Sequence, residues 1–152
     1  MFSTPDKIVT QPALLRRCAS WRVRQDELVF THGAFDLLHP VHTTYLEEAR
    51  ALGQRLIVGV YADTLKPELA LSQADRCRLL AALMVVDGVV VLEDPSPDDL
   101  VAALKPDVVV APVEEDATPV SPALILEHGL RFVELARPDL QELVALVAKL
   151  RG

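Results

Sequence analysis

The feature that most constrains the fold is an alternation of short, β-branched apolar runs with stretches of helical character. Five runs have the composition of strands, at residues 28–31, 55–61, 88–92, 107–111 and 131–135. The connections between them carry helix-start signals and lack the tight-turn signals of hairpins. The pattern therefore predicts an α/β fold, with a doubly wound sheet of five parallel strands and helices on both faces.

A helix signal follows each of these strands, which completes a Rossmann-like pattern. A capping serine or a proline near the first helical position opens four of the helices, at Pro40, Ser72, Ser96-Pro97 and Ser121-Pro122. The first of them is expected to end before Gly53, and the second to cover residues 76–84 after an S-x-x-D capping box. The last helix carries a stripe expected to pack on the sheet, made of Leu140, Leu143, Val144, Val147 and Leu150.

Length and charge narrow the class of protein. A chain of 152 residues is expected to form one domain, over residues 1–152. Its net charge of −7 argues against a nucleic-acid surface, which needs an excess of lysine and arginine. No apolar run approaches the ~20 residues of a membrane span, and the N-terminus lacks a secretory pattern. We therefore expect a cytoplasmic protein that does not contact membranes.

The two cysteines indicate neither a disulfide framework nor a zinc site. Cys18 and Cys77 lie far apart in the sequence and outside any CxxC or Cys/His cluster. We expect both to be reduced thiols in the core.

The segment THGAFDLLHPVHTTYLEEA, residues 31–49, follows the first strand and leads directly into a helix. In a parallel sheet, ligands bind beyond the carboxyl ends of the strands. The start of a helix favours an anion there, and Gly33 allows the backbone to approach it closely. The sequence therefore predicts a phosphate site at this position.

His39 and His42 flank the first turn of that helix, so both imidazoles can face one phosphate. Such donors stabilise charge on phosphate oxygens without a covalent intermediate. Two other interpretations remain open from spacing alone. One histidine can cap the helix while the other is a surface residue, or the pair can bind a metal, with Asp36 as a third ligand. A simpler role for Asp36 is to hold the loop by accepting local N–H bonds.

Residues 33–42 read Gly-Ala-Phe-Asp-Leu-Leu-His-Pro-Val-His, which resembles the G-x-F-D-x-x-H-x-G-H signature of the cytidylyltransferase-like nucleotidyltransferases. The resemblance extends to residues 6–10, 48–63 and 75–90. It is strongest to the adenylyltransferase domain of heptose-phosphate enzymes, with glycerol-3-phosphate cytidylyltransferase close behind. It implies transfer from ATP or CTP to a sugar or polyol phosphate, with release of pyrophosphate and assistance from Mg²⁺.

The resemblance also assigns residues to roles. His39 and His42 would be catalytic and contact the nucleotide phosphates. The residues expected to bind the nucleotide are Thr31, Gly33, Ala34, Phe35 and Arg76. The residues expected to bind the acceptor are Asp36, Asp63 and Lys66. For Arg76 and Lys66, a solvated side chain is the alternative. No residue is assigned as a metal ligand, and a homodimer is left open.

Three departures from the family pattern support a second hypothesis. Val41 replaces a glycine between the histidines and is expected to crowd the nucleotide. Residues 111–116 are partly acidic where relatives carry glycines and an aspartate, and residues 136–140 replace a Ser-Thr-Thr element. Arg137 is a candidate substitute for the missing donors. The alternative function is accordingly a catalytically inactive descendant that binds a nucleotide or a protein.

Overall fold

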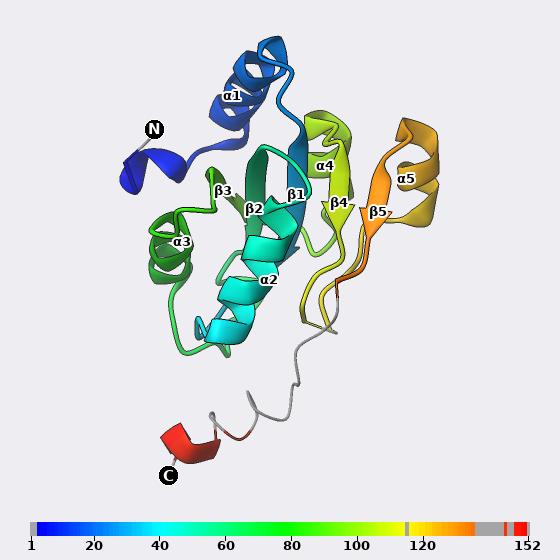
Figure 1. Cartoon of the computed structure of the whole chain (residues 1–152). Coiled ribbons are helices and arrows are strands. Elements are labelled where there is room, and N and C mark those ends of the chain that lie inside the picture. The colour runs from blue at the N-terminus through cyan, green and yellow to red at the C-terminus, as the bar shows by residue number, and fades with distance from the viewer. Residues whose placement is uncertain (1–2, 115, 136–144, 146–147, 152) are drawn as a thin grey trace.

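The computed structural model of the chain describes residues 3–114, 116–135, 145 and 148–151. Five strands form one sheet in the order β3-β2-β1-β4-β5, and every pairing is parallel (Figure 1). The strands are β1 (Leu28–Gly33), β2 (Arg55–Tyr61), β3 (Gly88–Leu92), β4 (Val108–Val110) and β5 (Arg131–Val133). The strand order reverses at β1, so a ligand crevice is expected between the loops that follow β1 and β4.

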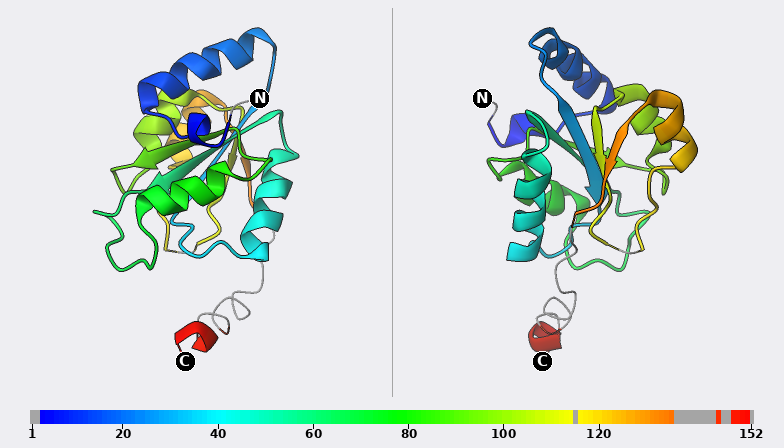
Figure 2. Two further views of the ribbon diagram at one scale, coloured as in Figure 1. Left: turned by 90° about the vertical axis from the view of Figure 1, so that its left-hand side faces the viewer. Right: turned by 45° about the vertical axis from the view of Figure 1, so that its right-hand side comes forward.

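Helices cover both faces of the sheet, which confirms the predicted fold class (Figure 2). One face carries α1 (Gln11–Val23), α4 (Asp98–Leu104) and α5 (Pro122–His128), and the other carries α2 (Pro40–Arg50) and α3 (Gln73–Ala81). A short 3-10 helix, η1 (Pro5–Lys7), precedes α1. In the described part of the chain, no helix has both the length and the apolar character needed to cross a bilayer.

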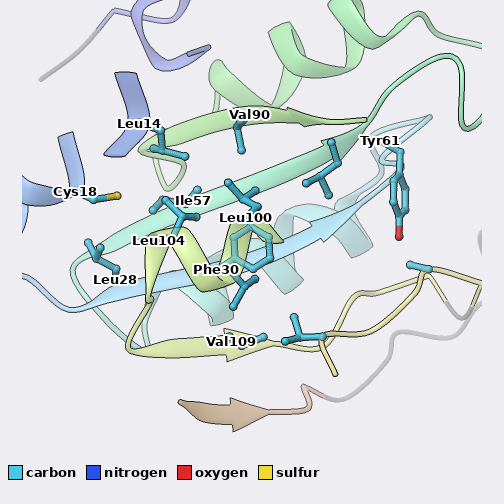
Figure 3. Packing of buried hydrophobic residues seen from close by; sticks show 14 of the residues in the cluster. Leu14, Cys18, Leu28, Phe30, Ile57, Tyr61, Val90, Leu100, Leu104 and Val109 are labelled. Carbon is cyan, nitrogen blue, oxygen red and sulfur yellow. The ribbon is translucent and has the colours of Figure 1, made fainter. Parts of the chain in front are cut away.

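The core consists of two apolar clusters separated by the sheet. Side chains of a strand alternate between its faces, so Leu28 and Phe30 join the cluster under α1 and α4 (Figure 3). Val29 joins the cluster under α2 and α3. Cys18 and Cys77 are free and buried in opposite clusters, as expected. Burial raises the pKa of each thiol to about 11, so both stay protonated at neutral pH.

Helix α1 was not predicted. Its signals are local, because the Thr10 hydroxyl accepts the N–H of Ala13 and Pro12 lies in the first turn. The capping box at Ser72 is confirmed, since its hydroxyl accepts the N–H of Asp75 at 3.2 Å, but α3 begins at Gln73, before the predicted residue 76. Ser121 likewise caps α5.

Most of the final predicted helix lies outside the described residues. Within its apolar stripe, Leu140, Leu143, Val144 and Val147 lie outside the described residues, as does the segment 136–140. Leu150 is described and is exposed.

Candidate functional site

The loop from β1 to α2 lies at the reversal in strand order, between the loops that follow β2 and β4. A cavity of about 200 Å³ opens there and is called the carboxyl-end cavity. Its lining residues are Ala34, Asp36, Leu37, His42, Lys66, Glu68, Leu69, Glu114 and Asp116. The cavity therefore lies where parallel sheets bind ligands, as predicted from the sequence.

His39 and His42 cap the first turn of α2 reciprocally. The Nδ1 atom of His39 accepts the N–H of Val41 at 3.2 Å, and Nδ1 of His42 accepts the N–H of His39 at 3.1 Å. Because both Nδ1 atoms act as acceptors, each neutral ring carries its proton on Nε2. Both histidines thus cap the turn, whereas the sequence allowed this role for one of them and expected the other at the surface. The caps leave Nε2 of each ring as the donor available to a ligand.

The two rings differ in their relation to the cavity. His42 is 5% exposed, meets the Phe35 ring edge to face at 5.9 Å and lines the carboxyl-end cavity, whereas His39 does not line it. Burial lowers the pKa of His42, and the neighbouring His39 lowers it further. At neutral pH, His42 is therefore a neutral N–H donor and not a cation.

Glu114, in the loop after β4, places its carboxyl group against the loop after β1. The Phe35 N–H donates to Oε1 of Glu114 at 3.0 Å. A Cβ atom added to Gly33 would lie 2.2 Å from Oε2, so the absence of a side chain at Gly33 makes room for this carboxyl group. Phe35 has a φ of +51°, an unusual backbone conformation for a residue with a side chain. The predicted phosphate position thus holds a carboxyl group that the protein supplies itself.

The Glu114 carboxyl group is poorly compensated. Its Oε2 atom is buried and has no hydrogen-bond partner among the described residues. Burial raises the pKa of Glu114, nearby Asp116 adds to the rise, and the backbone N–H groups of Phe35 and Ala34 oppose it. An unpaired buried polar group costs about 1–3 kcal/mol. A ligand that displaces this carboxyl group therefore relieves an existing cost.

Asp36, in the loop after β1, forms hydrogen bonds with the loop after β2. Its Oδ2 atom accepts the N–H of Ala70 at 2.9 Å, and its Oδ1 atom accepts the N–H of Leu71 at 2.8 Å. Asp36 was predicted to hold its own loop by accepting local N–H groups. It does accept backbone N–H groups, but the donors belong to a loop distant in the sequence. Asp36 instead joins the loops that follow β1 and β2.

Arg76 joins the same two loops from α3. Its side chain is fully buried, and it donates to the Ala34 carbonyl at 2.8 Å, to the Leu71 carbonyl at 3.1 Å and to Oδ1 of Asp63 at 3.1 Å. Asp63 also accepts the N–H of Gln73 and stays half-exposed. The structure thus brings Arg76 and Asp63 together as a brace beneath the cavity, and neither lines it.

Lys66 and Thr31 lie in different surroundings. Lys66 lines the cavity, and its Nζ atom lies 2.8 Å from the largely exposed Asp116 carboxylate. That hydrogen bond is the main cause of a raised pKa of Lys66. Thr31 is fully buried, and its hydroxyl pairs with the Tyr45 hydroxyl at 2.5 Å. Of these two, only Lys66 can meet a ligand in the cavity.

Sequence reasoning missed the position of Glu114, which it treated only as part of the partly acidic segment 111–116. It also missed His32, a fully buried side chain whose Nε2 atom lies 2.7 Å from the Thr118 carbonyl, close to the Tyr61 ring. Strand alternation from Phe30 could have placed His32 in the core. Val41, expected to crowd the nucleotide, does not line the cavity.

The described side chains do not form a resident site for Mg²⁺. Among them, no three of the histidine, cysteine or carboxylate type gather around one point. Both oxygens of Asp36 already accept N–H groups, and Asp116 is paired with Lys66.

Residues 30–147 match the family model described as cytidylyltransferase-like. The chain is 42% identical over 110 residues to the bifunctional protein HldE of Methylobacillus flagellatus, and 45% identical over 113 residues to that of Magnetococcus marinus. These matches cover 68% and 70% of this chain, but only 22% and 23% of the relatives. The chain thus corresponds to less than a quarter of the length of these relatives.

A solved structure supports the fold independently. The lipopolysaccharide core biosynthesis protein from Thermoplasma volcanium superposes with a TM-score of 0.64 at 24% identity. The match covers 75% of this chain and 99% of the other. At this level of identity the likeness concerns the fold alone.

Proposed function

The chain belongs to the cytidylyltransferase-like family, and from this premise we propose that it is a nucleotidyltransferase that joins a nucleoside triphosphate to a sugar phosphate. An oxygen of the acceptor phosphate attacks the α-phosphorus of the triphosphate. The bond from that phosphorus to the β-phosphate breaks, and pyrophosphate leaves with the electron pair. The protein's part in such a reaction is mainly positioning and charge stabilisation.

One structural observation carries the proposal: His42, in the first turn of α2, and Ala34, in the loop after β1, line one cavity at the carboxyl end of β1. The positive end of the helix dipole and backbone N–H groups favour phosphate oxygens here. The Nε2–H of His42 adds a donor whose tautomer is set by its bond to the His39 backbone. His39 acts from the neighbouring cap position and keeps the turn in shape.

Nucleotide binding requires Glu114 to leave the N–H of Phe35, because carboxylate and phosphate compete for the same donor. The present cavity of about 200 Å³ is small for a nucleotide, since ligand pockets usually measure about 300–1,000 Å³. Withdrawal of the Glu114 side chain enlarges the cavity and removes the negative charge from it. Mg²⁺ bound to the triphosphate would neutralise phosphate charge, and its arrival with the substrate suits the lack of a resident site.

The acceptor is proposed to enter beside Lys66. This residue faces the cavity and holds Asp116 by a single exposed ion pair, which is weak in water. An acceptor phosphate can therefore replace the Asp116 carboxylate at little cost. The resemblance to heptose-phosphate enzymes makes ATP and a heptose phosphate the first pair of substrates to test, with CTP and glycerol phosphate next.

The test is pyrophosphate release by the purified chain with ATP or CTP, Mg²⁺ and a panel of sugar and polyol phosphates. We expect release with at least one pair, and no release when the acceptor is omitted. Nucleotide binding without turnover across the whole panel would contradict the proposal and favour the inactive alternative. That alternative is not favoured by the relatives, whose identity to this chain exceeds 40% over 110 residues or more.

A further inference from the structure

A concentration of positive charge lies at the opposite end of the sheet. A cavity of about 510 Å³, called the amino-end cavity, opens where β2 and β3 begin, beside the second half of α1 and the last turn of α2. Five of the nine residues that line it are basic: Lys7, Arg17, Arg24, Arg50 and Arg55. In the whole chain, lysine and arginine number only 15 of 152 residues. A chain with a net charge of −7 thus gathers a third of its cations around one cavity.

Internal ion pairs neutralise only part of this charge. Asp87 is the single carboxylate among the described lining residues, and it already serves Arg50 at 3.2 Å, Arg55 at 3.4 Å and the Leu56 N–H at 2.8 Å. Asp26 pairs with Arg55 at 2.9 Å from outside the lining. Arg55 therefore has two carboxylate partners, and both oxygens of Asp87 are already engaged.

The cavity also has a preformed wall. The Arg55 guanidinium lies 5.3 Å from the centre of the buried Trp21 ring, and the Arg50 side chain is tied to the Gly53 carbonyl at 2.7 Å. The Lys7 ammonium donates to the Leu83 carbonyl at 3.0 Å. Cations held in place by such contacts lose little conformational entropy when they bind an anion. Arg24 is exposed at the rim and free to reorient toward a ligand.

We propose that the amino-end cavity is a second anion site, which takes a small multivalent phosphate, such as the polyphosphate group of a nucleotide or free inorganic polyphosphate. Several cations around one concave surface match the spread charge of such a group, and arginine suits phosphate because its planar fork binds two oxygens. The site lies apart from the carboxyl-end cavity, with which it shares no lining residue. It does not depend on the proposed transferase activity.

The test is calorimetric titration of inorganic tripolyphosphate into the Mg²⁺-free chain. The double variant Arg17→Gln/Arg24→Gln removes two lining cations, and we expect its affinity to fall by about tenfold or more, since charge-assisted bonds are the strong ones. The control is Arg16→Gln, an exposed arginine next to Arg17 on α1 that does not line the cavity, and its affinity should match that of the parent. Arg24→Gln alone tests the exposed rim, where loss of the side chain spares the fold.

Further arms identify the ligand chemistry and the place of binding. ATP, tripolyphosphate and adenosine separate a polyphosphate preference from base recognition, and adenosine is expected not to bind. Binding should weaken steeply as KCl rises. Binding that is lost in His42→Ala but kept in Arg17→Gln/Arg24→Gln would place the anion at the carboxyl end and overturn the proposal. Absence of saturable binding to the parent, or equal affinity in the parent and the double variant, would overturn it as well.

Discussion

The two ends of the sheet carry opposite charge. A phosphate-binding α/β fold suggests positive charge at the carboxyl end, but in this chain the carboxyl end is acidic and the amino end is basic. The carboxyl-end cavity is lined by four carboxylates, from Asp36, Glu68, Glu114 and Asp116, against the single cation Lys66. The amino-end cavity has five cations against one carboxylate. The fold directs backbone N–H groups and the α2 dipole to the carboxyl end, whatever the side chains are. Backbone geometry and side-chain charge are therefore independent contributions, and in this chain they point to different ends.

The difference also concerns how each charge is used. At the carboxyl end, the carboxylates of Asp36, Glu114 and Asp116 hold a backbone N–H or Lys66, so the cavity is closed by the protein's own bonds. At the amino end, Asp87 is shared by two arginines and a backbone N–H, and it is the single carboxylate among the described lining residues. The first end must open before it binds an anion, whereas the second is ready to bind one.

The largest expected effect assigns the chemistry to the carboxyl end. His42→Ala removes the Nε2–H donor at the cavity, and loss of one such donor typically costs ~10²- to 10³-fold in turnover. His39→Ala should reduce turnover less, because His39 does not line the cavity. It should also remove a cap of α2 and lower the free energy of unfolding by about 1 kcal/mol. Pyrophosphate release measures both. His128→Ala on α5 is the matched control, and an equal loss in that variant would remove the special role of His42.

The next effect concerns Arg76, whose charge stabilises the loops at the carboxyl end and does not face the cavity. Arg76→Met leaves two carbonyls and Asp63 without their buried donor, and we expect the free energy of unfolding to fall by about 2–3 kcal/mol in urea titrations. Arg78→Met on the exposed side of α3 is the control and should change stability little. A normal stability with strongly weakened nucleotide binding would instead give Arg76 the nucleotide-binding role expected from the family.

Glu114→Gln removes the competing charge and sharpens the comparison between the ends. We expect nucleotide affinity at pH 7.5 to rise by about tenfold, which corresponds to ~1.4 kcal/mol and lies within the cost of an unpaired buried group. Glu68→Gln, which removes a carboxylate from the same lining, serves as the control. Calorimetry that shows equal gains in both variants would mean that general charge, and not the position of Glu114, limits binding.

The pH dependence of the same variant has a definite sign. Because folding raises the pKa of Glu114, its ionisation destabilises the fold, so stability falls as pH rises from below its unfolded pKa through its folded pKa. Glu114→Gln should therefore be more stable than the parent at pH 7.5, by about 1 kcal/mol, and not at pH 4. For nucleotide affinity, a rise on acidification that persists in Glu114→Gln but is lost in Glu114→Gln/His42→Ala belongs to His42, whose pKa is lowered by burial.

The smallest effect is expected from Val41→Gly. Sequence reasoning predicted that this change relieves crowding, but Val41 does not line the cavity, where Glu114 approaches Gly33 instead. We therefore expect nucleotide affinity to change by less than about twofold, corresponding to ~0.4 kcal/mol. An improvement of fivefold or more in calorimetry would restore the crowding hypothesis.

Much of the fold could be predicted because its signals are local and periodic. The five β-branched runs became the five strands, and the caps at Pro40, Ser72 and Ser121 start helices where expected. The ends of the strands were predicted less well, since β4 covers Val108–Val110 and not the predicted residues 107–111. Helix α1 was missed although Thr10 and Pro12 mark its start, because it precedes β1 and so lies outside the alternation of strands and helices.

For the site, the sequence by itself predicted an anion position at the carboxyl end of the first strand, together with the donors around it. Glycine at 33, a helix start at 40 and histidines three residues apart are properties of contiguous sequence, since a strand, a loop and a helix turn fix their relative positions within ten residues. Tertiary structure alone decided that Glu114, 79 residues from Phe35, occupies that position, and that Arg76 is buried in a brace. It also decided that cations from η1, α1, α2 and β2 share one cavity. The physical reason is that charge is compensated through space, by partners that only the packing of distant elements brings within bonding distance.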